Sequence, residues 1–217
     1  IFGQRLNAAT GAELGGDLRL SDMGPDGSTS YRAFNPAVAY NNQNDQYLVV
    51  WLGDDNSGGL VDEEYEIFGQ RLNAATGAEL GGDLRLSDMG PNGSTSYDAY
   101  YPAVAYNSSA NQYLVVWQGD DNTGELVDEE VEIFGQRVNA ATGAELGGDF
   151  RLSDMGPDGS TSYGAFTPAV AYNSQNNEYL VVWQGDDNTG GLVDEEVEIF
   201  GQRVANQALV LLPLVRR

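Results

Sequence analysis

The chain repeats itself every 66 residues. The segment IFGQR begins at Ile1, Ile67, Ile133 and Ile199, and the first two units match at 54 of 66 positions without an insertion. The 217 residues therefore divide into repeats 1–66, 67–132 and 133–198 and a partial fourth, 199–217, which ends in the unrelated sequence ANQALVLLPLVRR. A fixed repeat of this kind is typical of proteins in which each unit stacks on the next. We expect residues 1–217 to form one such array or a segment of it.

Each unit contains four short segments with strand character, separated by turn-forming residues. In the segment QYLVVWLG, Tyr47, Val49 and Trp51 fall on one face of a strand, and Leu48 and Val50 fall on the other. The four segments that form the first complete set are 36–40, 46–53, 65–72 and 83–87. Four strands in every unit predict an all-β fold, a β-propeller with one 66-residue blade per repeat. The unit is longer than the roughly 40–50 residues usual for a blade, and a β-solenoid is the alternative.

The strands begin and end out of phase with the blades. The chain opens with the third and fourth strands of a blade and ends with the first three strands of another. The two incomplete blades could join within the chain and close a three-bladed ring. Alternatively, their unpaired edges dock onto a neighbouring copy, because an exposed strand edge is a template for another strand. The apolar segment 208–215 fills the fourth position of the last blade, is donated to a neighbour, or is the ragged end of an array.

The composition excludes several classes of function. The chain has no His, Cys or Lys, and 33 acidic residues against 10 Arg give a net charge of −23. Without His or Cys there is no Ser-His-Asp triad, thiol nucleophile or transition-metal site with nitrogen or sulfur ligands. The negative charge repels nucleic acid. The sequence contains no apolar run of about 18 residues, so it predicts no insertion into a membrane. Carboxylate catalysis and binding of a hard cation remain.

An acidic segment, GDDNSGGLVDEEYE at 53–66, recurs at 119–132 and 185–198, and 19 of the 33 acidic residues lie in these three segments. Its spacing resembles the D-x-[DN]-x-[DN]-G-x-x-D calcium loop of integrin-alpha type propellers, in which oxygen atoms at alternate positions bind Ca²⁺. Two positions depart from that pattern: Gly58 takes the place of the third ligand, and Glu125 replaces the turn glycine in the second copy. The alternative is a solvated acidic surface. The resemblance implies a Ca²⁺ cofactor, with ligands from four positions of each loop: Asp54, Asn56, Leu60, Asp62, Asp120, Asn122, Leu126, Asp128, Asp186, Asn188, Leu192 and Asp194.

The pattern PAVAYN…YLVVWQGDD…EIFGQRVNAATG resembles the repeats of bacterial secreted and cell-surface β-propeller proteins. The resemblance covers the chain except for its last dozen residues, and it implies an extracellular, secreted or cell-surface location. The absence of Cys agrees with that location, since a stable propeller needs no disulfide bonds.

The sequence favours a non-enzymatic role, with no catalytic residue assigned. Identical acids in three copies suit a repeated ligand better than one asymmetric active site. We therefore expect a structural or adhesive unit of a bacterial surface or biofilm matrix, stabilised by calcium, whose partners are other copies of itself joined head to tail or by strand exchange.

Two alternatives involve carbohydrate. A lectin-like module would bind polysaccharide through aromatic residues that vary between repeats and that we expect in loops beside the acidic segments, namely Phe34, Tyr100, Tyr101 and Phe166. A glycoside hydrolase, which needs a pair of carboxylates, is the more remote alternative. The segment GPDGSTSY does not match the S-x-D-x-G-x-T-W spacing of the sialidase Asp box, because Gly27 directly follows Asp26.

Overall fold

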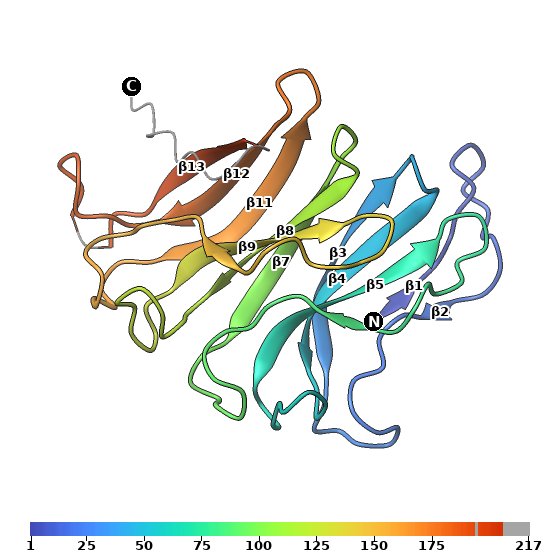
Figure 1. The fold of residues 1–217 in the computed structure, drawn as a ribbon, viewed down its shortest axis with the longest axis horizontal. Coiled ribbons are helices and arrows are strands. Elements are labelled where there is room, and N and C mark those ends of the chain that lie inside the picture. The colour runs from blue at the N-terminus through green and yellow to red at the C-terminus, as the bar shows by residue number, and fades with distance from the viewer. Residues whose placement is uncertain (194, 206–217) are drawn as a thin grey trace.

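The computed structural model describes residues 1–193 and 195–205, which form thirteen β-strands and no helix. Four antiparallel sheets contain all of these strands (Figure 1). The first is a hairpin of β1 (Phe2–Gly3) and β2 (Leu18–Arg19), and the second consists of β3 (Ala33–Asn41), β4 (Gln46–Asp54), β5 (Tyr65–Asn73) and β6 (Leu84–Arg85). The third consists of β7 (Ala99–Asn107), β8 (Gln112–Gly119), β9 (Glu132–Asn139) and β10 (Phe150–Arg151). The fourth consists of β11 (Ala165–Asn173), β12 (Glu178–Gly185) and β13 (Glu198–Ala205).

The sheets are propeller blades, as the repeat predicts. In each complete blade the strands pair in chain order, β3-β4-β5-β6 and β7-β8-β9-β10, and the innermost strands β3, β7 and β11 lie next to one another. The alternation predicted for β4 is confirmed: Val49 and Trp51 belong to one apolar cluster, and Leu48 and Val50 belong to another. Each face of a blade therefore packs against a different neighbour.

The core lies between the blades. One cluster joins Leu48, Ile67 and Leu86 of the first complete blade to Tyr113 and Trp117 of the second. A second cluster joins the second blade to β11–β13, and a third joins the β1–β2 hairpin to β4 and β5. Because each of the two complete blades contributes to two clusters, the apolar area buried between successive blades holds the array together.

Two boundaries differ from the sequence prediction. The fourth strand is only two residues long, Leu84–Arg85 in place of the expected 83–87, because it pairs with β5 at two positions only. The first strand begins at Ala33, three residues before the expected Pro36, and it contains a bulge between Phe34 and Ala37 where Asn35 has a φ of 50°. A bulge places an extra residue in one strand of a pair, so β3 continues past the point where its apolar alternation ends.

The blades form an open fan within the described residues. The β1–β2 hairpin and the β11–β13 sheet lie at opposite ends of the molecule (Figure 1), and no strand pairing joins them. The segment 208–215, with the three roles considered for it, falls outside the described residues. No helix that is long and apolar enough to cross a membrane occurs in residues 1–193 and 195–205.

Candidate functional site

The loops that connect successive blades contact the acidic segments of those blades. The Gly24 N–H donates to Asp55 Oδ1 at 2.9 Å, and the Gly93 N–H donates to Glu64 Oε2 at 3.0 Å. These bonds confirm that the loop after the fourth strand and the acidic segment between the second and third strands share one face of the array. Backbone amides thereby satisfy part of the negative charge that the sequence concentrates there.

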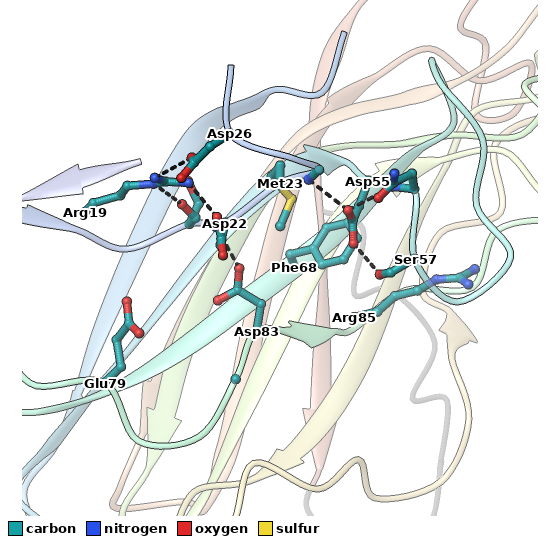
Figure 2. A pocket seen from close by; sticks show the side chains of 14 residues that line it. Arg19, Asp22, Met23, Asp26, Asp55, Ser57, Phe68, Glu79, Asp83 and Arg85 are labelled. Carbon is teal, nitrogen blue, oxygen red and sulfur yellow. Dashed lines mark hydrogen bonds and ion pairs between the residues drawn. The ribbon is translucent and has the colours of Figure 1, made fainter. Parts of the chain in front are cut away.

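A polar cavity lies where these loops meet at the first boundary, between the β1–β2 hairpin and the first complete blade. It has a volume of about 710 Å³ and is bounded by the segment 19–26, the acidic loop, β5 and the turn before β6. Figure 2 shows Arg19 and Asp22 on one side of it and Asp55 on the other, with Asp83 directed toward the segment that carries Asp22. Its volume is in the range of small-molecule sites, which is about 300–1,000 Å³.

Arg19 is the basic group on one side of this cavity. Its guanidinium binds the carboxylate of Asp22, and it binds Asp26 at 2.7 Å. The repeat equivalent, Arg85, binds the buried Glu66. The side chain of Arg19 is 47% exposed against 21% for Arg85. Arg19 is therefore accessible to a ligand in the cavity.

Asp83 is the half-buried carboxyl group of the cavity. Its Oδ2 accepts a hydrogen bond from the Asp22 N–H at 3.0 Å. Burial raises the pKa of Asp83, the hydrogen bond from Asp22 lowers it, and the nearby carboxylates of Glu79, Asp22 and Asp55 raise it further. A half-buried carboxyl group with a raised pKa beside other carboxyl groups is a candidate for proton transfer.

Asp83 is not among the site residues predicted from the sequence. The available signal is an aspartate immediately before the short fourth strand in every unit, at Asp17, Asp83 and Asp149. This signal does not distinguish Asp83, because the flanking residues of all three aspartates are nearly the same.

The same site is smaller at the second boundary. Asp121, Phe134, Asp149 and Arg151 occupy the equivalent positions around a cavity of about 220 Å³. Burial raises the pKa of Asp149 to about 7, the hydrogen bond from the Asp88 N–H lowers it, and Glu145 raises it further. The two boundaries therefore offer related chemistry in cavities of different size.

The structure divides the predicted calcium ligands into buried and exposed groups. The first aspartate of each loop is buried, at Asp54, Asp120 and Asp186. The side chains of the other polar positions are exposed, namely Asn56, Asp62, Asn122, Asp128 and Asn188. The leucines whose carbonyls were predicted as ligands pack their side chains on the apolar clusters, namely Leu60, Leu126 and Leu192. Asp194 lies outside the described residues.

No three or more acidic side chains converge on a metal position in the part of the chain that the structure describes. Glu125 has a φ of 74° at the position where Gly59 and Gly191 occur in the other loops. The preceding Gly124 also has a positive φ, 65°.

The predicted carbohydrate-binding aromatics lie on strands, not in loops. Phe34 is in β3, Tyr100 and Tyr101 are in β7, and Phe166 is in β11. Phe34 and Tyr101 are exposed, while the half-buried Tyr100 donates from its hydroxyl to Asp98 Oδ2 at 2.8 Å. Their placement in loops was wrong because each inner strand continues through its bulge. These residues belong to three different blades.

Comparisons with solved structures support the propeller fold. A Hadza microbial sialidase aligns with a TM-score of 0.53 and 12% identity, over 82% of this chain and 35% of the sialidase. An N-acetylgalactosamine deacetylase from F. plautii aligns with a TM-score of 0.52 and 14% identity, over 83% of this chain and 51% of the deacetylase. An endo-1,5-alpha-L-arabinanase from Thermotoga petrophila RKU-1 aligns with a TM-score of 0.45 and 15% identity, over 78% of this chain and 40% of the arabinanase.

The chain thus spans about a third to a half of the length of the solved structures it matches. No protein-family model matches the sequence, and a search of curated proteins finds no match.

These comparisons contradict the prediction of a non-enzymatic structural or adhesive protein. The solved structures that share the fold include a sialidase and a deacetylase, both enzymes. The argument from repetition was wrong for a physical reason: identical acids do not have identical surroundings. Asp83 borders the cavity of about 710 Å³, whereas Asp149 borders the one of about 220 Å³.

Proposed function

We propose that the chain acts on carbohydrate: it binds a glycan in the cavity at the first blade boundary and hydrolyses a glycosidic bond there. The observation that carries the proposal is Asp83, a half-buried carboxyl group with a raised pKa that lines, with other acidic residues and two arginines, a cavity large enough for a sugar. The enzymes that share the fold add support, but at 12–14% identity the similarity concerns the fold and not the substrate.

The cavity supplies the groups that glycoside hydrolysis needs. Asp83 would protonate the glycosidic oxygen, because burial favours its protonated form. Asp22, whose carboxylate is held by Arg19, would be the second carboxylate, which supports the positive charge that develops on the sugar ring. Arg19 and the Asn56 amide supply hydrogen-bond donors for sugar hydroxyls or an acidic sugar.

The test measures hydrolysis and binding separately. Release of reducing ends is followed with sialosides, arabinan and galactan as substrates, and binding of the same oligosaccharides is followed by titration calorimetry. Asp83→Asn keeps an oxygen that can accept the Asp22 N–H but cannot donate a proton as an acid. We expect it to lower hydrolysis at least 100-fold while binding stays within a factor of three.

Asp149→Asn is the matched control, since it makes the same change beside the smaller cavity and should leave hydrolysis unchanged. Binding without hydrolysis by the unaltered protein would replace the enzyme with a lectin-like module. If no glycan in the panel is bound or cleaved, the proposal is wrong.

We further propose that the acidic loops bind Ca²⁺, as the resemblance to integrin-type loops implies. The support is Asp54: its side chain is buried, Oδ1 has no hydrogen-bond partner, and Oδ2 accepts the Glu63 N–H at 3.1 Å. Burial raises the pKa of Asp54 to about 6, the Glu63 amide lowers it, and the carboxylates of Asp62 and Glu63 raise it. A bound cation would stabilise the charged form of this group.

Calcium binding is tested by thermal unfolding in 5 mM EDTA and in 5 mM CaCl₂. We expect a higher melting temperature in Ca²⁺, by several degrees, and Asp54→Asn should remove much of that increase. Mg²⁺ at the same concentration controls for screening of the surface charge. Equal melting temperatures in EDTA and Ca²⁺, with no heat of binding by calorimetry, would exclude a calcium site.

We propose an extracellular or cell-surface location, as the resemblance to secreted repeats implies, because polysaccharide is accessible there. Detection of the protein in the culture medium or on intact cells by antibody tests this location.

A further inference from the structure

Several residues that differ between the repeats gather where the two complete blades meet. Tyr65 begins β5, Asp98 directly precedes β7, and Tyr100 and Tyr101 lie in the first turns of the β7 backbone. β7 packs against β5 of the preceding blade and lies between the inner strands β3 and β11 (Figure 1). This boundary therefore has further strands on both sides.

The next boundary, between the second complete blade and β11–β13, carries no such polar group. In place of Tyr65, Asp98 and Tyr100, the following repeat has smaller or apolar residues, namely Val131, Gly164 and Phe166. The Phe166 ring lies over Gly164, where a Cβ atom would be 2.7 Å from Phe166 Cζ. Two blades pack together with this apolar set, so the polar set is not required for packing. Residues that depart from the repeat without a need of the fold point to function.

Asp98 is the centre of the polar group. Its Oδ1 accepts the Tyr65 N–H at 2.8 Å, and its Oδ2 accepts the Tyr100 hydroxyl at 2.8 Å. The Tyr65 and Tyr100 rings lie with their centroids 5.9 Å apart. These contacts fix the half-buried carboxylate in one orientation. A carboxylate has about four acceptor positions, so Asp98 can accept further hydrogen bonds from a ligand.

Tyr101 is the exposed member of the group. Its side chain is 47% exposed, and its φ of 52° lies in the left-handed region, as do those of Asn35 and Thr167 at the equivalent positions. Asparagine tolerates this conformation, whereas a bulky residue adopts it at a cost. Neither the backbone nor burial favours a large ring at this position. An exposed ring on a strained backbone therefore indicates contact with a ligand.

A hydrogen bond of the next boundary cannot form beside Tyr101. The Thr167 N–H donates to Gln118 Oε1 at 2.8 Å. The repeat equivalent of Gln118 is Leu52, whose side chain has no acceptor. The Tyr101 N–H lacks this side-chain partner, so it is a candidate donor for a ligand. The apolar ring of Tyr101, its N–H and the Asp98 carboxylate together offer a flat face, a donor and an acceptor.

The electrostatic surroundings restrict the ligand to an uncharged one. Burial raises the pKa of Asp98, and the hydrogen bonds from Tyr65 and Tyr100 lower it. The nearby carboxylates of Glu64 and Asp128 raise it again. These carboxylates repel a phosphate, sulfate or carboxylate group on a ligand. A neutral sugar ring fits the remaining chemistry, because it presents C–H groups on its face and hydroxyl groups at its edge.

We propose that Asp98 and Tyr101 form a second carbohydrate-binding site, which takes one ring of an uncharged glycan. Tyr101 stacks on the face of the sugar, the Tyr101 N–H donates to one hydroxyl, and Asp98 accepts from another. Tyr100 holds Asp98 in position. The inference rests on the proposed function for its ligand class, but its residues lie outside the cavity that contains Asp83. Both sites border the acidic segment 53–66, so a polymer held at one is retained near the other.

The test compares binding of polymers by variants that cannot cleave them. In the Asp83→Asn background, affinity electrophoresis and titration calorimetry measure binding of galactan, arabinan and mannan. Tyr101→Asn introduces the residue that the first repeat carries as Asn35, at a φ of 50°, so the fold should be retained. We expect it to weaken binding about tenfold. Thr167→Asn is the matched control, because it makes the same change of residue at the exposed equivalent position and should leave binding unchanged.

Failure of this site and failure of the proposed function give different results. If the natural sequence cleaves a glycan but Tyr101→Asn binds the polymer as tightly as its parent, the second site is wrong and the proposed function stands. If nothing is cleaved and Tyr101→Asn still weakens binding of a polymer, the second site stands and hydrolysis is wrong. Absence of binding to all three polymers overturns the second site.

The charge of the ligand provides an independent measurement. Binding of galactan should change less than about twofold between 0.05 and 0.5 M NaCl, because no ion pair forms. Polygalacturonate, an acidic relative of galactan, should bind at least about tenfold more weakly, and Asp98→Asn should reduce that difference. Tighter binding of polygalacturonate than of galactan would contradict the site. Binding of oligolysine that depends on Tyr101, without binding of galactan, would show a cationic partner and also overturn it.

Discussion

Glutamine in place of Glu132 should stabilise the protein at alkaline pH. Glu132 is buried in the second complete blade. Its Oε1 accepts the Met155 N–H at 2.7 Å and its Oε2 accepts the Ser153 hydroxyl. Burial raises the pKa of Glu132 to about 7, and the bonds from Ser153 and Met155 and the charge of Arg151 offset only part of that increase. Desolvation of the carboxylate therefore outweighs its favourable contacts.

The magnitude follows from the difference between the two pKa values. The pKa of Glu132 is about 7 in the folded state against 4.5 for an ordinary glutamate. Between these values the folded chain keeps a proton that the unfolded chain has released, so the free energy of unfolding falls as the pH rises. The loss is complete above pH 7. At about 1.4 kcal/mol per pKa unit, it amounts to about 3 kcal/mol.

Glutamine is neutral at every pH and nearly the same size as glutamate. Its oxygen can accept the Met155 N–H, and its amide can donate to the Ser153 oxygen. We expect Glu132→Gln to raise the free energy of unfolding by about 1–3 kcal/mol at pH 8 and to change it little at pH 4.5. For a chain of this length, each kcal/mol corresponds to about 2–4 °C in melting temperature.

The assay is urea unfolding followed by tryptophan fluorescence from pH 4.5 to pH 8.5. Glu198→Gln is the matched control, because it removes the same charge at the equivalent repeat position, where the side chain is exposed. The reasoning is refuted if Glu132→Gln is less stable than the natural sequence at pH 8, or if Glu198→Gln stabilises as much, since the cause would then be net charge and not burial.

Three further outcomes follow from differences between equivalent positions. Glu125→Gly should stabilise by about 0.5–1 kcal/mol in thermal unfolding, because it relieves a φ of 74°; a loss of stability would contradict the strain. Leu114→Ala should lower the free energy of unfolding in urea by about 2–5 kcal/mol, because Leu114 is buried. Leu180→Ala, at the equivalent but exposed position, should lower it by less than about 0.5 kcal/mol. Equal losses would contradict the difference in burial. Arg71→Met should lower the free energy of unfolding by about 1–3 kcal/mol, because the Arg71 guanidinium donates to the Ala141 carbonyl of the next blade at 2.6 Å. Arg203→Met, at the equivalent position in β13, should leave the free energy of unfolding unchanged.

The blade could be predicted from the sequence because its determinants are local. The alternation of Tyr47, Val49 and Trp51 against Leu48 and Val50 assigns each side chain to one face, and both faces are buried as that pattern requires. The bulge at Asn35 could not be predicted, because it depends on how β3 pairs with β4 and not on an apolar pattern. The placement of Phe34 in a loop was wrong for the same reason.

The site could not be predicted because its determinants lie between repeats. Asp83 meets Asp22, which is 61 residues earlier in the chain, and no pattern within one unit reports that contact. The acidic segment was visible by its composition, but its contacts with Gly24 of the same repeat and Gly93 of the next repeat were not. Sequence patterns report the periodicity of a strand, whereas the electrostatics of a cavity depend on which strands meet.

A repeated sequence can carry an asymmetric site because a residue's properties depend on its neighbours as well as on its identity. Glu132 is buried while Glu198, at the same position of the next repeat, is exposed. Arg85 binds the buried Glu66 and the exposed Asp88, whereas Arg19 binds two exposed carboxylates, those of Asp22 and Asp26. Position along the array thus differentiates units that the sequence makes nearly equal.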